Sequence, residues 1–257
     1  MAAVNVQAVD PATGTEQALA SAVVHNPIFA ACSAAQLLTF CASASVHHAR
    51  RGVRLATKGA PFPYLGFVID GVIAVTAKAE GEIRSGVRSL RLYEAYPGST
   101  FCEISFLDGY EALGEITVVS KHARYALFPS KSVMDVADAD PRFLHRLAVH
   151  AASRCRELKR RLVDQATRPV AARVAAVLLP FASNSSGLSP VDPQLIEFAQ
   201  RDIAAAAGCV KEAAARAIAQ LEQAGALRRE HGRIRHLDRA QLSYYAEIAQ
   251  TGVWDGA

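Results

Sequence analysis

The sequence predicts an α+β protein with an N-terminal antiparallel β-roll of the jelly-roll type, a long dimerisation helix and a C-terminal winged helix-turn-helix. Between residues 47 and 136, short runs rich in β-branched and aromatic residues alternate with glycine turns. After Asp140, apolar residues follow a heptad spacing. Residues 201–227 read as two helices joined by a tight turn at Gly208. Together these three patterns predict the fold class.

Composition limits the classes of function. The chain has 257 residues, of which 51% are apolar, so it is long enough for one large or two modest domains with a real core. Its formal net charge of +4 is compatible with a nucleic-acid partner. The five cysteines form no CxxC pair, and no uncharged apolar stretch is long enough to span a membrane. We therefore expect a soluble cytoplasmic protein with no membrane partner.

The first part of the chain divides into an arm and a roll. Residues 1–25 show little periodicity, which predicts a flexible N-terminal arm. Residues 26–139 are assigned to the β-roll, whose interior is wide enough for one small ligand; a filled core without a ligand is the alternative. The predicted strands cover residues 53–56, 65–69, 72–77, 89–93, 116–119 and 123–129.

A long helix over residues 140–166 follows, because Asp140-Pro141 combines a capping aspartate with a proline at the first helical position. Its apolar residues form a narrow seam with alternating spacings of four and three, the pattern of a two-stranded coiled coil. We predict a homodimer joined through this seam; packing within one chain is the alternative. The dimer seam consists of Leu144, Ala148, Ala151, Cys155, Leu158 and Leu162.

Residues 167–257 are predicted to form a winged helix-turn-helix that binds DNA. Small residues allow its two helices to cross closely, and the second helix presents Lys211, Glu212 and Arg216 to base edges in the major groove. An alanine-rich helical hairpin with solvated charges is the alternative.

A basic hairpin follows the second helix. It covers residues 227–235, includes Arg233 and forms a wing suited to backbone phosphates.

Together these parts resemble the cyclic-AMP receptor protein/FNR superfamily of bacterial transcription regulators, over about residues 26–240. The resemblance is carried by Asp202-Ile203-Ala204, Gly208-Cys209, Lys211-Glu212, Arg216, Leu221, Gly225-Ala226-Leu227 and, in the roll, by Pro97–Ile104, which is similar to the family's G-x-x-F-G-E element. It implies that the roll is a cyclic-nucleotide-binding-like effector or sensor domain.

The resemblance also implies roles for single residues. Lys211 and Arg216 stand where the family reads guanine, and Glu212 where it accepts from the cytosine amino group, in agreement with the chemistry of these side chains. Gln200 and Arg201 are placed for phosphate rather than for bases. Two departures are Val210, where a capping serine is usual, and Ala213, where the family often has a hydroxyl residue.

The effector pocket departs further from the family. Its glutamate is present as Glu103, but the preceding glycine is Cys102, and the segment that should carry an Arg-Ser pair reads Glu-Ala-Leu-Gly-Glu at residues 111–115. Carboxylates there would repel a cyclic phosphate, so we expect no binding of cyclic AMP in the family's usual way, unless Lys159 or a relocated arginine supplies the cation. The expected pocket residues are Cys102, Glu103, Ile104, Ala112, Leu113, Leu158 and Lys159.

No cofactor is identified, and no metal site is predicted. Cys32 and Cys41 alone cannot supply the four thiolates of an iron–sulfur cluster. Formal haem ligands exist, although surface or packed side chains are the commoner explanation for each. These residues are His47, His48, Cys102, His122, His145 and His150.

The function expected is that of a homodimeric, sequence-specific transcription regulator that reads a palindromic operator in double-stranded DNA, with RNA polymerase as a candidate partner. A cyclic-nucleotide-responsive or haem- or redox-sensing regulator remains an alternative, as does a ligand-binding module acting through protein contacts. An enzyme of the cupin type is not expected, because residues 53–119 contain no histidine to hold a catalytic metal.

Overall fold

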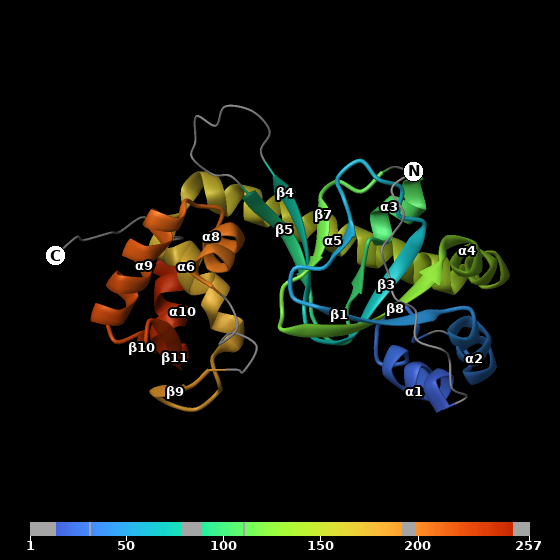
Figure 1. The fold of residues 1–257 in the computed structure, drawn as a ribbon, viewed down its shortest axis with the longest axis horizontal. Helices are drawn as coiled ribbons and strands as arrows, with labels where there is room; N and C mark the ends of the chain where they lie inside the picture. Colours follow the sequence, from blue (N-terminus) through green and yellow to red (C-terminus); the bar gives the residue numbers. More distant parts are fainter. Residues whose placement is uncertain (1–13, 31, 79–88, 110, 192–198, 249–257) are drawn as a thin grey trace. The chain divides into compact units, whose positions relative to one another are not determined.

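The structure is a computed structural model that describes residues 14–30, 32–78, 89–109, 111–191 and 199–248 (Figure 1). The chain divides into two compact units. Unit 1 comprises residues 1–77 and 92–158, and unit 2 comprises residues 78–91 and 159–257.

The β-roll consists of two antiparallel four-stranded sheets, which confirms the predicted fold class. In the first sheet the order is β1 (Ser45–Arg50), β8 (His122–Pro129), β3 (Tyr64–Asp70) and β6 (Thr100–Phe101). In the second it is β2 (Arg54–Ala56), β7 (Glu115–Val118), β4 (Ile73–Lys78) and β5 (Ser89–Ala95).

Two strands of the roll lie outside the predicted set. β1 has the sequence SVHHAR, which lacks the apolar alternation of a typical strand, yet it pairs with β8 along its whole length. Its His47 is buried because the ring stacks on Tyr125 with 5.5 Å between centroids. β6 has two residues and is too short to produce a period.

The interior of the roll is filled by apolar side chains from both sheets, including Leu55, Val68, Phe101 and Ile116. Gly66 faces Phe101 so closely that a Cβ atom there would lie 2.1 Å from the phenyl ring. A glycine in β3 is therefore required for Phe101 to occupy the core.

A second core lies on the outer side of the first sheet. Here α1 (Gly14–Val23), α2 (Ala34–Ala42), α4 (Ser130–Ala139) and the start of α5 pack around a cluster of phenyl rings, with Phe40 stacked on Phe128 at 4.2 Å. Residues 14–23 were expected to belong to a flexible arm. They form a helix instead, because Leu19 and Val23 are buried in this core; residues 1–13 lie outside the described part of the chain.

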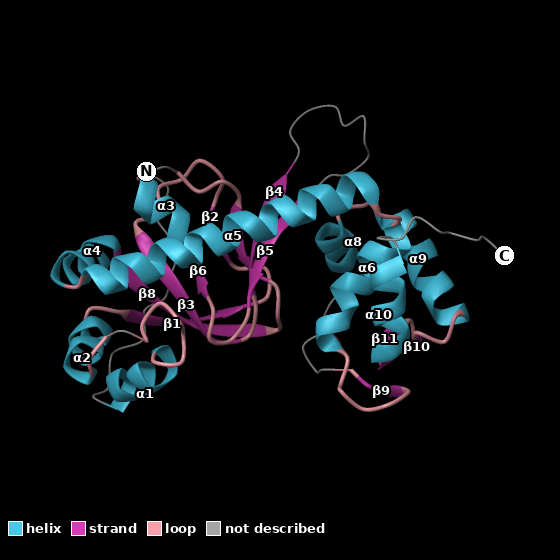
Figure 2. Cartoon of the chain, turned by 180° about the vertical axis from the view of Figure 1, so that it is seen from behind, coloured by secondary structure: helices cyan, strands magenta, loops and turns pink. Residues whose placement is uncertain are grey.

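The helix α5 (Pro141–Thr167) matches the span expected for the dimerisation helix and runs without a break (Figure 2). Asp140 stabilises its start by accepting a hydrogen bond from the backbone N–H of Arg142 at 3.0 Å. Phe143 and Leu147 anchor it to the second core. No helix among the described residues is both long and apolar enough to cross a membrane.

Unit 2 contains the winged helix-turn-helix. Its helices are α6 (Val170–Leu178), η1 (Leu179–Phe181), α8 (Gln200–Ala207), α9 (Lys211–Gln223) and α10 (Arg239–Ile248). Its strands β10 (Leu227–Glu230), β11 (Arg233–Asp238) and β9 (Leu188–Pro190) form one antiparallel sheet.

Candidate functional sites

The helix-turn-helix is held by backbone capping at its turn. Gly208 ends α8 with φ 62°, the left-handed conformation that glycine adopts without strain. Arg173 of α6 donates to the carbonyl oxygens of Ala207 and Gly208, at 2.6 and 3.0 Å, and so satisfies the end of α8. These contacts set the start of α9.

Three charged side chains, Lys211, Glu212 and Arg216, lie exposed on the first two turns of α9. The opposite face of the helix is buried through Ala214, Ala217, Ile218 and Leu221. No hydrogen bond or ion pair to another described residue engages any of the three charged side chains. They are available to an external partner, and their combination of donors and acceptor suits the edges of G·C base pairs.

The start of α9 lacks a side-chain cap. Val210 occupies the N-cap position in an extended conformation and supplies no hydrogen bond to the first turn, as its side chain predicts. At the start of α8, Arg201 is exposed and Gln200 is half-buried, which leaves both near the surface of the same motif.

The wing is tied to α9 by Glu222. This carboxylate accepts from the backbone N–H of Arg229 at 2.9 Å and from its side-chain Nε at 2.8 Å. The hydrogen bonds from Arg229 hold the pKa of Glu222 below its usual value. Beyond this tie, His231 and Gly232 both adopt positive φ, 51° and 74°, and turn the chain into β11, where Arg233 is exposed at the tip.

Residues of the predicted dimer seam are largely uncovered in the single chain. Leu144 is 42% exposed and Leu162 is 68% exposed. Ala148 and Cys155 are also exposed, whereas Ala151 and Leu158 are half-buried. A continuous helix thus presents large apolar side chains that the rest of the chain leaves in contact with water.

A cavity of about 50 Å³ opens in unit 1 between β4, β5, β7, the start of α3 (Glu103–Asp108) and α5. Five of the expected pocket residues line it, namely Cys102, Glu103, Ala112, Leu113 and, from α5, Leu158. Lys159 is exposed and is not among the lining residues, because the next position on a helix points about 100° away. The side chain of Ile104 lies outside the described residues.

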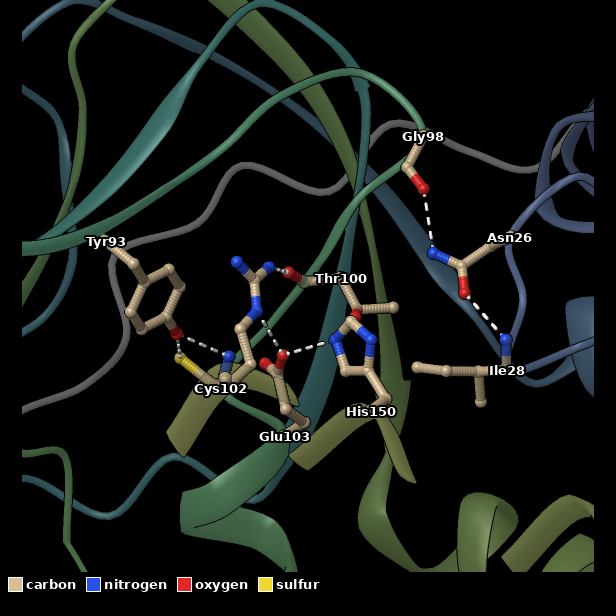
Figure 3. A network of polar contacts seen from close by, with 9 residues as sticks. Asn26, Ile28, Tyr93, Gly98, Thr100, Cys102, Glu103 and His150 are labelled. Carbon is tan, nitrogen blue, oxygen red and sulfur yellow. Dashed lines mark hydrogen bonds and ion pairs between the residues drawn. The ribbon is translucent and has the colours of Figure 1, made fainter. Parts of the chain in front are cut away.

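The centre of the cavity wall is Glu103, whose side chain is only 2% exposed. Its Oε1 accepts from Nε2 of His150 at 2.7 Å, as Figure 3 shows, and from Nε of Arg154 at 3.1 Å. Burial raises the pKa of Glu103, but the hydrogen bond from His150 and the charge of Arg154 outweigh it and hold the pKa below its usual value. Glu103 is therefore an ionised buried carboxylate.

Arg154 is held in place by several partners. Besides Glu103, its Nη2 donates to the backbone carbonyl of Thr100 at 3.1 Å, and its guanidinium lies over the ring of Tyr93 at 5.1 Å from the centroid. Among the described residues that line the cavity, Arg154 is the one cation, and it is already paired with Glu103; this part of the chain therefore offers no uncommitted cation for a cyclic phosphate.

Cys102 takes the place of the glycine expected before Glu103, and its backbone conformation is one that glycine usually adopts. Its φ is 64°, a left-handed conformation that favours glycine. The backbone N–H of Cys102 donates to the hydroxyl of Tyr93 at 2.8 Å, which fixes the turn (Figure 3). Burial raises the pKa of the Cys102 thiol, so the sulfur is neutral and weakly nucleophilic.

His150, Arg154 and Tyr93 were not assigned to the pocket from the sequence. A signal exists in retrospect, because Phe143, Leu147, His150 and Arg154 follow spacings of four, three and four and form a second stripe on α5. Phe143 and Leu147 pack in the second core, and His150 and Arg154 contact Glu103, so the whole stripe faces the interior of unit 1.

The other formal haem ligands are dispersed. His47 contacts Ser45 at 2.8 Å, His122 lies 3.6 Å from Asp70, and His48 and His145 are exposed. Within the part of the chain that the structure describes, no group of three or more His, Cys, Asp or Glu side chains is arranged to hold a metal ion.

Comparison with known proteins gives matches to both units. Residues 172–245 match the Crp-like helix-turn-helix domain family. The transcriptional regulator SdrP of Thermus thermophilus is 31% identical over 113 residues, which are 44% of this chain and 56% of that protein. The chain thus matches little more than half the length of this curated relative.

Solved structures extend the likeness to the roll. TTHA1359 of Thermus thermophilus, a transcriptional regulator of the CRP/FNR family, is 27% identical with a TM-score of 0.61, over 79% of this chain and 98% of that one. FixK2 of Bradyrhizobium japonicum shares the fold at 19% identity and a TM-score of 0.66, over 79% and 96%. With its β-roll, its long helix and its Crp-like helix-turn-helix, the chain is similar to transcription regulators of the CRP/FNR family.

Proposed function

We propose that this protein is a homodimeric, sequence-specific DNA-binding transcription regulator of the cytoplasm, and not an enzyme. The observation that carries the proposal is the exposed triplet Lys211, Glu212 and Arg216 at the start of α9, whose side chains have no partner among the described residues. Guanidinium and ammonium groups donate to guanine, and a carboxylate accepts from cytosine. Such a triplet reads a short G·C-containing half-site.

The remaining contacts go to the DNA backbone. Gln200 and Arg201 at the start of α8 and Arg233 at the tip of the wing supply donors for phosphates, which orient the protein without reading sequence. A protein with two such motifs related by a two-fold axis reads a palindrome, with half-sites about one helical turn apart.

The second motif comes from a second copy of this chain. Leu144 and Leu162 are exposed on α5 of the single chain. A parallel coiled coil through the seam defined above would bury both against the same helix of a partner. An effector in the roll would act by repacking this seam and shifting the two helix-turn-helix motifs between two states. RNA polymerase is the partner that a regulator of this kind engages once on DNA.

The effector differs from cyclic AMP bound in the family's usual way. Ala112, at the position expected to supply the phosphate-binding arginine, is buried, and its backbone bonds to Gly59 and Ala60 hold the segment in place. Arg154 does not replace the missing cation, because Glu103 already engages it. A titration with cyclic AMP that raised DNA affinity would contradict this part of the proposal.

A gel-shift experiment with a selected palindromic duplex tests the assigned recognition helix. Arg216→Ala should weaken specific binding by about 1–3 kcal/mol, or roughly 5- to 150-fold, because one bidentate contact to guanine is lost. Gln223→Ala is the matched control, since Gln223 is exposed at the far end of the same helix. Unchanged specific binding by Arg216→Ala would refute the assignment of α9.

A further inference from the structure

The turn between α8 and α9 is contacted from two sides by elements that precede it in unit 2. On one side Arg173 donates to the carbonyl oxygens of Ala207 and Gly208. On the other side lies Gln165, a half-buried residue in the last turn of α5. Its side chain covers Gly208 so closely that a Cβ atom there would lie 2.4 Å from Nε2, 2.9 Å from Cδ and 3.2 Å from Cγ. The end of α5 therefore touches the helix-turn-helix at its turn.

The contact between Gln165 and Gly208 is one of packing. No hydrogen bond to another described residue engages the amide of Gln165. Three successive atoms of its side chain crowd the place that a Cβ atom would take, so a rotation of the terminal amide alone would not make room for an alanine. A glycine in the turn is what lets Gln165 occupy this place.

Gly208 thus meets two separate demands. Its φ of 62° lies in the left-handed region, which other residues adopt at a cost, and the space beside its Cα atom is taken by Gln165. Gly225, beyond the other end of α9, meets only the first demand, because its φ is 76° and nothing lies within 4 Å of its Cβ position. A comparison of the two glycines therefore separates backbone strain from the contact with Gln165.

The place of this contact in the motif links it to DNA reading. Lys211 and Glu212 follow Gly208 by three and four positions, so a shift of the turn moves the start of α9. In the proposed function, α5 is also the helix through which two copies of the chain are joined. A rotation of α5 would reach the turn through Gln165 directly, besides the covalent link at Arg168-Pro169.

We infer that Gln165 is a positioning residue for operator reading, which fixes the direction of α9 relative to the end of α5 by packing on Gly208. It touches no base and acts through the turn. In a dimer joined along α5, this contact sets the spacing at which the two reading helices meet the DNA. The inference rests on the proposed function and names the residue that couples the dimerisation helix to the reading helix.

Gel shifts with the full-length protein test this role on two duplexes, the selected palindrome and a duplex that carries one half-site. Gln165→Ala should weaken binding to the palindrome about tenfold or more, because the two motifs no longer engage both half-sites together at a fixed spacing. Binding to the single half-site should stay within about twofold, since each motif keeps its reading side chains. An equal loss on both duplexes would indicate a merely structural role, and unchanged binding to both would indicate none; either result would overturn the inference.

Two matched variants accompany this measurement. Gln165→Met keeps an uncharged, unbranched side chain of similar length over Gly208 and should bind both duplexes as the wild type does. Thr167→Ala changes an exposed residue of the same helical turn, whose hydroxyl donates to the carbonyl oxygen of Val163, and should also bind normally. A loss of palindrome binding in either variant as large as that in Gln165→Ala would contradict the assignment to packing by Gln165.

Urea unfolding tests the contact without DNA. Gly208→Ala should unfold at a lower urea concentration than Gly225→Ala, because both variants carry the strain of a positive φ but only the first displaces Gln165. When Gln165→Ala is present in both proteins, this difference should shrink to less than about half, because the two sites are coupled by contact. A difference of undiminished size would overturn the contact on which the inference depends.

The two proposals fail in different ways. If Gln165→Ala reads the palindrome as the wild type does while Arg216→Ala loses it, only the positioning role is removed. If Arg216→Ala binds unchanged, the assigned reading helix is removed and the positioning role with it. The urea comparison of the two glycines does not depend on DNA and decides in either case whether Gln165 packs on the turn.

Discussion

Glu103 shows how one buried side chain can join two elements of unit 1. Its first oxygen is engaged by His150 and Arg154 of α5, and its second oxygen is buried without a partner among the described residues. These contacts fix α5 to the turn before α3. An ionised carboxylate in this position tolerates burial only because its charge is paired and hydrogen-bonded.

Glu103→Gln should destabilise the protein by about 3 kcal/mol at pH 7, because the largely buried Arg154 loses its charged partner. The pKa of Glu103 lies below its usual value of 4.5, so its contribution is full above that value and is lost as the pH falls through the folded pKa. Urea unfolding at pH 7 and near pH 3 measures the difference between wild type and variant. A difference that does not shrink in acid would show that the carboxylate charge is not responsible.

At the scale of elements, α9 begins without the cap that helices of this kind usually have. Val210 is already in the extended conformation of an N-cap residue, with φ −73° and ψ 153°, so only the side-chain acceptor is absent. The helix is stabilised instead by its buried face and by the hydrogen bonds that Arg229 donates to Glu222. Tertiary packing thus compensates for a weak local signal.

Val210→Ser should stabilise unit 2 by about 1 kcal/mol relative to Val210→Ala, because serine can accept from the unsatisfied N–H groups of the first turn. Thermal or urea unfolding of the two variants measures this difference, and the alanine variant corrects for loss of the valine side chain. Equal stability of the two proteins would mean that the first turn is already satisfied in another way.

The wing is expected to contribute affinity without specificity. Arg233→Ala should weaken binding to specific and unrelated duplexes by similar factors and reduce the slope of log K against log salt by about 1, because one phosphate contact is lost. Salt titrations of DNA binding measure the slope. Lys131→Ala, an exposed change on α4 of unit 1, serves as the control. A loss confined to the specific site would assign Arg233 to base reading instead.

For the whole molecule, the decisive property in the proposed function is the assembly of two chains. The seam residues on α5 include large apolar side chains for which the single chain supplies little cover, with Leu162 at 68% and Leu144 at 42% exposure. A coiled coil buries such side chains and brings two recognition helices under one symmetry axis. Dimerisation and operator reading are therefore linked in this proposal.

Leu162→Glu should convert the dimer into a monomer at micromolar concentration, because two carboxylates would meet in the seam. Light scattering after size-exclusion chromatography gives the mass. Val163→Glu is a matched control, since Val163 is also exposed but lies next to the seam instead of in it. A dimer that persists in Leu162→Glu and dissociates in Val163→Glu would place the interface on another face of α5.

Local patterns in the sequence indicated the order of most elements. The glycine turns indicated most strands of the roll, and the Asp140-Pro141 signal marked the start of α5 to within one residue. The helix α1 and strand β1 were missed, because each depends on burial against distant residues and not on its own period.

The sequence by itself determined the β-roll and the helix-turn-helix, and it marked Lys211, Glu212 and Arg216, because capping, turn and periodicity signals are local. Only the tertiary structure decided what lines the cavity. Glu103 meets His150 and Arg154 across 47 and 51 residues of chain, and no spacing rule joins positions so far apart. The same contacts left Oε2 of Glu103 unpaired among the described residues, because packing fixes where each polar atom ends.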